Sequence, residues 1–107
     1  MRIPNKLKAF GTVISVIKVE EPTEITRDGN CIGRYDADAS CIVLTKRTTS
    51  QKLLSPDVKC ETFLHEVLHV INNYMLEDTR RLEEGQIDQM SKGLFAIIKD
   101  NKLRFDE

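Results

Sequence analysis

The chain has 107 residues, enough for one domain with a modest hydrophobic core and too few for a two-lobed enzyme. Its 16 Lys and Arg against 17 Asp and Glu residues give a net charge of −1, so nucleic acid is not an expected partner. No apolar run approaches the ~20 residues of a membrane span, and the first residues lack the apolar segment of a secretory signal. We therefore expect a cytoplasmic protein with no membrane partner.

Three stretches are predicted to form strands. Residues 10–20 contain a run of β-branched residues that is apolar on both faces, which indicates a strand inside a sheet. Residues 31–36 and 41–45 are two short strand-like runs separated by turn-forming residues, which predicts a hairpin.

Two helices are predicted after the strands. Ser55, Pro56 and the acidic residue that follows are typical of a helix N-terminus, and apolar residues then recur at helical spacing over about residues 56–76. A second apolar repeat covers about residues 80–100. The order predicts an α+β fold: a single domain over residues 1–107, with a small three-stranded antiparallel or mixed sheet packed on two helices.

The cysteines do not indicate a disulfide framework. Cys31, Cys41 and Cys60 are an odd number and have no C-x-x-C spacing. We expect free thiols, buried as small apolar side chains.

The first predicted helix carries the motif His-Glu-x-x-His at His65, Glu66 and His69. At ~100° per residue the two imidazoles project from one helix face and can bind one metal ion, with Glu66 beside them. Apolar residues flank the pair on both sides, so the imidazoles should be half-buried and need a partner such as zinc. The alternative is a histidine pair on the exposed face of an amphipathic helix.

A catalytic zinc ion usually has three protein ligands and one open position. Because the chain has only two histidines, the third ligand would be Asp, Glu or Cys. Cys60 should lie on the side of its helix opposite His65, which leaves Glu83 and Glu84 at the start of the second helix. These two acids are also explained without a metal, since carboxylates stabilise a helix N-terminus.

The segments 63–69 and 82–94 resemble the small zinc-metallopeptidase-like proteins of phages and prophages, which are similar to minimal gluzincins. This resemblance covers roughly residues 31–101 and implies a zincin-like fold. In gluzincins a glutamate on the next helix is the third zinc ligand, and an aspartate one turn later hydrogen-bonds the first zinc histidine. The resemblance thus implies Glu84 as the ligand and Asp88 as the aspartate, because Glu83 would place Ile87 in the aspartate position. The linker between His69 and Glu84 is shorter than in larger gluzincins.

These features predict a zinc-dependent metallopeptidase. His65, His69 and Glu84 would hold Zn²⁺, and Glu66 would act as general base on a zinc-activated water and then protonate the leaving amine. A peptide or protein substrate would pair with an edge strand, either residues 31–36 or 41–45. Tyr74 is expected in the core, and the candidates for stabilising the oxyanion are Tyr35, Arg80 and Arg81.

Two other functions fit the same motif. The chain could be a phage-derived binding or regulatory protein with a structural or vestigial zinc site, or a hydrolase of non-peptide amides or esters. Glu66 favours catalysis over the first of these, because a closed structural zinc site needs no base beside it.

Overall fold

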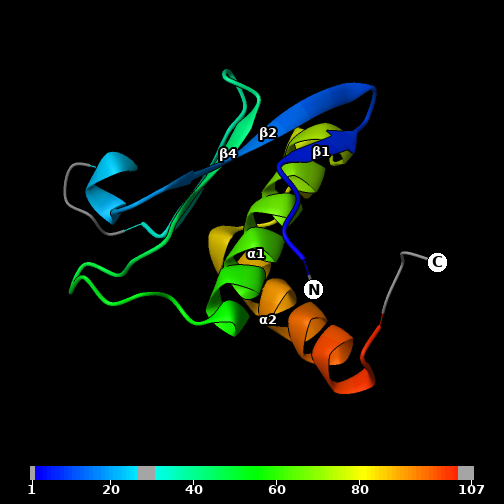
Figure 1. The fold of residues 1–107 in the computed structure, drawn as a ribbon. Helices are drawn as coiled ribbons and strands as arrows, with labels where there is room; N and C mark the ends of the chain where they lie inside the picture. The colour runs from blue at the N-terminus through cyan, green and yellow to red at the C-terminus, as the bar shows by residue number, and fades with distance from the viewer. Residues whose placement is uncertain (1, 27–30, 104–107) are drawn as a thin grey trace.

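The computed structural model describes residues 2–26 and 31–103. Four strands and two long helices lie in three layers, with α1 between the sheet and α2 (Figure 1). The α+β class and the two helices are thereby confirmed. The elements are β1 (Lys6–Ala9), β2 (Thr12–Val19), β3 (Gly33–Asp36), β4 (Cys41–Thr45), α1 (Pro56–Met75) and α2 (Glu84–Asn101), with short 3₁₀ turns at Pro22–Glu24 and Asp78–Arg80.

The predicted number of strands was wrong, because the sheet has four strands rather than three. The additional strand, β1, is short and half-exposed, and it forms an antiparallel hairpin with β2. Phe10 and Gly11, which we had assigned to the following strand, form the two-residue turn of this hairpin. Both residues have positive φ angles, 52° and 76°, as expected for a two-residue hairpin turn. The backbone twist of such a turn matches the twist of the two strands that it joins.

The strand order is β1-β2-β4-β3, and the sheet is mixed. β2 pairs in parallel with β4, with Val16 opposite Ile42, while β3 and β4 form the predicted antiparallel hairpin. Residues 41–45 are therefore interior and cannot be the edge strand that a substrate joins. Of the two candidates, only β3 lies at an edge.

α1 begins at the residue that its capping sequence predicts, whereas α2 begins later than predicted. The Ser55 hydroxyl accepts a hydrogen bond from the Val58 amide at 3.2 Å and so caps α1, and Pro56 is the first helical residue. α2 begins at Glu84, four residues later than predicted, because the segment before it is a 3₁₀ turn followed by extended backbone.

The core lies between the sheet and the inner face of α1. Its largest fully buried side chains include Ile14, Ile42 and Val70, with Phe63 packed beside them. Cys41 and Cys60 are buried, as predicted, whereas Cys31 is only half-buried, and none of the three forms a disulfide within the described part of the chain. Tyr74 is not in the core: it is 42% exposed and stacks on Phe10 at a centroid distance of 5.4 Å. Among the described residues, no helix combines the length and apolar character needed to cross a bilayer.

Candidate metal centre

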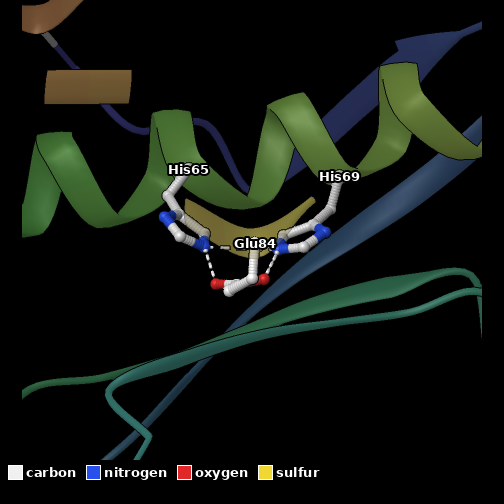
Figure 2. A group of neighbouring side chains, drawn as sticks. All are labelled: His65, His69 and Glu84. Atoms are coloured by element: carbon white, nitrogen blue, oxygen red, sulfur yellow. Dashed lines mark hydrogen bonds and ion pairs between the residues drawn. The ribbon is translucent and has the colours of Figure 1, made fainter. Parts of the chain in front are cut away.

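His65 and His69 point from one side of α1 toward the carboxylate of Glu84, which comes from α2 (Figure 2). The two Nε2 atoms are 3.2 Å apart; His65 Nε2 lies 2.6 Å from Glu84 Oε1, and His69 Nε2 lies 2.9 Å from Glu84 Oε2. Ligands ~2.0–2.1 Å from a tetrahedral zinc ion stand about 3.3 Å from one another. The three distances here are slightly shorter, so a small outward shift of these side chains would fit them around one ion, and the three residues could hold a metal.

The local helix geometry explains why the histidines face α2. Phe63 and Val70 pack on the sheet in the core cluster, so His65 and His69 emerge beside that face of α1 rather than in it. Their side chains are 16% and 27% exposed, which is the half-buried environment predicted from the flanking apolar residues. Burial lowers the pKa of His69 and favours the neutral imidazole that a metal ligand must be.

Glu84 rather than Glu83 reaches the histidine pair. Glu83 is the N-cap of α2, where it forms a capping box: its side chain accepts from the Gln86 amide, and its own amide donates to the Gln86 side chain at 2.9 Å. In that role Glu83 bonds within its own helix, while Glu84 in the first turn of α2 lies within ion-pair distance of both imidazoles.

Asp88 lies one turn after Glu84 and faces the far nitrogen of the first histidine. Its Oδ1 is 3.5 Å from His65 Nδ1, and its Oδ2 is 3.0 Å from the Lys92 ammonium. The hydrogen bond from Lys92 lowers the pKa of Asp88 and keeps it ionised. An ionised carboxylate near Nδ1 favours the tautomer protonated there, which leaves the Nε2 lone pair for a metal.

Glu66 is a buried carboxyl group, only 6% exposed. Burial raises its pKa to about 7, while His65 and a hydrogen bond from the Tyr35 backbone act in the opposite direction. A bound cation would add to these opposing effects and favour the carboxylate. A carboxyl group whose pKa is near neutrality suits a general base that must take up and release a proton.

A hollow of about 230 Å³ lies next to Glu66, between α1, α2 and the edge strand β3. It is lined by His65, Glu66, Asp88 and Ser91 from the helices, together with Gly33 from β3. The close approach of β3 to α1 depends on Gly33, because a Cβ atom there would stand 2.6 Å from the methyl carbon of Thr62.

Asn72 is a residue of the site region that we did not predict. Its side chain donates to the Leu82 carbonyl at 3.1 Å and accepts from the Leu82 amide at 2.8 Å, so it fixes the backbone two residues before Glu84. A paired amide bond of this kind joins residues ten positions apart and has no signature in the sequence. Its position one turn after His69 is the only sequence signal that could have suggested it.

The side chains of two proposed oxyanion helpers take part in other interactions, although the Tyr35 backbone is hydrogen-bonded to Glu66. The Tyr35 hydroxyl accepts from the Asn73 side chain at 3.3 Å, and Arg81 pairs with Asp78 at 3.2 Å. Burial raises the pKa of Tyr35, so its hydroxyl stays protonated. Within the described part of the chain, the hydrogen bond of the Tyr35 hydroxyl and the contacts of Arg81 do not involve the two histidines or Glu84.

Comparison with known proteins finds a similar fold in a solved structure. No family model matches the chain, and no curated protein matches it. A solved structure with a similar fold is the crystal structure of Wss1 from Saccharomyces cerevisiae, with a TM-score of 0.55 and 18% sequence identity over 84% of this chain. The match covers 65% of the Wss1 chain, so this protein corresponds to part of it.

Proposed function

We propose that this protein is a zinc-dependent metallopeptidase with His65, His69 and Glu84 as the zinc ligands and Glu66 as the general base. The observation that carries the proposal is the convergence of the two imidazoles and the Glu84 carboxylate, which place one ligand atom each within 4.8 Å of one another. The likeness to Wss1 concerns the fold, so the argument for the reaction rests on this site.

The donor set suits zinc. Two imidazoles and one carboxylate are a ligand combination of catalytic zinc sites, which keep a fourth position for water or substrate. The Glu84 side chain is 68% exposed, so the side of the cluster away from α1 is open to solvent. When bound there, zinc would polarise a substrate carbonyl and lower the pKa of a water molecule toward ~7.

Residues of this chain would transfer the proton, orient a zinc ligand and bind the peptide. Glu66 would take a proton from the attacking water and deliver it to the leaving amine nitrogen, and its raised pKa suits both steps. Asp88 would hold the His65 ring through Nδ1. The edge strand β3 pairs only with β4 within the described sheet, and its outer backbone groups other than the Tyr35 amide bonded to Glu66 would be available to an extended peptide.

The first test is zinc content by elemental analysis of the wild type and of the Glu84→Gln, Glu83→Gln and Glu66→Gln variants. We expect one zinc ion per chain in the wild type, retention in Glu83→Gln and Glu66→Gln, and loss in Glu84→Gln. Glu83→Gln is the matched control because it changes the neighbouring carboxylate, which caps α2 instead.

A peptide-library digestion then tests the reaction. The wild type should cleave peptides, whereas Glu66→Gln should bind zinc and cleave none. A wild-type protein that holds no zinc after refolding with the metal would refute the proposal. Zinc retention with no cleavage of any peptide would refute the peptidase and leave the binding or regulatory function.

A further inference from the structure

A large groove separates the sheet from the C-terminal half of α2. Its volume is about 1680 Å³, and its walls come from β2 and β4 on one side and from residues 95–103 on the other. The first turns of α1 form its base, and residues 2–5 border it. We call this region the basic groove.

The charged side chains that line the basic groove are almost all cationic. Asp57 is the one carboxylate among its lining residues, and it already pairs with Lys99. Lys46 pairs with Glu20 at 3.0 Å, while the cations other than Lys46 and Lys99 have no ion-pair partner among the described residues. The chain as a whole has a net charge of −1, so this is a local concentration of positive charge. The six cations are Arg2, Lys18, Lys46, Lys59, Lys99 and Lys102.

Apolar side chains lie between these cations. Leu44, Leu54 and Cys60 are buried beneath the groove, and Phe95 and Ile98 are half-buried along its α2 wall. Phe95 is the only aromatic residue among the lining residues. Single-stranded nucleic acid is bound by a series of aromatic platforms on which bases stack, so one phenyl ring among aliphatic side chains suits a polypeptide better.

The basic groove adjoins the candidate metal centre. Ile32 and Thr62 line both the groove and the hollow beside His65 and Glu66. A chain that lies in the groove would therefore lead directly into the hollow next to the proposed base.

We propose that the basic groove binds the part of the substrate polypeptide on one side of the cleaved bond, and selects acidic residues that alternate with apolar ones. This inference rests on the proposed peptidase function and names its substrate class. The acidic side chains would meet unpaired cations such as Lys18 on the sheet wall and Lys59 on α1, while the apolar side chains cover Leu44 and Ile98. Charge complementarity of this kind adds specificity and speeds encounter.

Fluorescence anisotropy with labelled peptides tests the proposal. The host protein is Glu66→Gln loaded with zinc, so that no probe is cleaved. The probes are a short peptide of alternating Glu and Leu, the same peptide with Gln for Glu, the same peptide with Lys for Glu, and a single-stranded DNA oligonucleotide. We expect the acidic peptide to bind best, and its affinity to fall as salt is raised.

The matched variants compare cations inside and outside the groove. Lys18→Glu combined with Lys59→Glu reverses one charge on each of two walls and should weaken binding of the acidic peptide about tenfold or more. Lys8→Glu reverses a cation on β1, outside the lining residues, and should leave the affinity nearly unchanged. Circular dichroism and zinc content check that each variant is folded.

Several outcomes would overturn the inference. Equal binding of the Glu and Gln peptides, no weakening in the double variant, or tighter binding of the DNA than of the acidic peptide each contradict it. If the double variant does not fold, a salt-independent affinity in the host protein contradicts it equally. Because binding is measured without turnover, a failure here leaves the peptidase proposal standing, and a wild type that binds the acidic peptide but cleaves nothing refutes only the peptidase.

Discussion

Replacing Gly33 by alanine tests how closely the edge strand must approach the helix that carries the site. The new Cβ would stand 2.6 Å from Thr62 Cγ2, 3.2 Å from Leu44 Cδ2 and 3.4 Å from Glu66 Oε2. Carbon atoms in favourable contact are ~3.5–4.0 Å apart, so the Thr62 contact is short by roughly 1 Å. The φ angle of Gly33 is not in the left-handed region, and the expected effect is therefore steric.

The Thr62 methyl group cannot move away without loss. The Thr62 hydroxyl donates to the Val58 carbonyl at 2.7 Å, and a change of rotamer would break this bond, which contributes ~1 kcal/mol. Displacing β3 instead would separate it from Glu66. Overpacking of this kind costs about 1–3 kcal/mol, and we expect Gly33→Ala to lower the free energy of unfolding by that amount and to reduce peptide cleavage.

Urea unfolding of a double-mutant cycle with Thr62→Ser measures the effect. Serine keeps the hydroxyl and removes the methyl group, so Thr62→Ser alone should cost only ~0.8 kcal/mol, and the double variant should recover about 1 kcal/mol or more of coupling. Gly93→Ala is the control: a Cβ there meets nothing within 4 Å in the middle of α2, and it should raise stability by about 0.5–1 kcal/mol. A Gly33→Ala protein as stable as the wild type, or zero coupling, would refute the steric argument.

Three further predictions concern the helices and the metal. Ser55→Ala removes the cap of α1 and should lower the free energy of unfolding by about 1 kcal/mol in urea. Asn72→Ala removes both hydrogen bonds to the Leu82 backbone and should weaken zinc binding about tenfold in a chelator competition. Asn73→Ala, which removes a hydrogen bond to the Tyr35 hydroxyl instead, should not. Zinc at one hundred times its dissociation constant should raise the free energy of unfolding by about 2.7 kcal/mol; an equal gain in the Glu84→Gln variant would contradict the assigned ligand.

Features that depend on near neighbours in the chain were predictable. Ser55 and Pro56 mark the start of α1 because a cap involves residues three positions apart. His65 and His69 share a face because four residues make about one helical turn. The β3–β4 hairpin follows from two short strands joined by a turn.

Features that depend on distant residues were not predictable in the same way. β1 was missed because four half-exposed residues with alternating lysines carry little signal until they pair with β2. The interior position of β4 results from its parallel pairing with β2, and parallel pairing has no local signature. Tyr74 was expected in the core, but its stacking partner Phe10 lies in the turn of a hairpin that had not been recognised.

The sequence by itself determined the two histidines, the carboxylate between them and the helix on which all three lie. Only the tertiary structure brought Glu84 to that pair, because the approach depends on the packing of α2 against α1 and on Asn72, which holds the segment before α2. The tertiary structure also gathered Lys18 from β2 and Lys59 from α1 along one groove. A chain with balanced charge can concentrate its cations only by folding, since residues far apart in sequence must first be placed on the same surface.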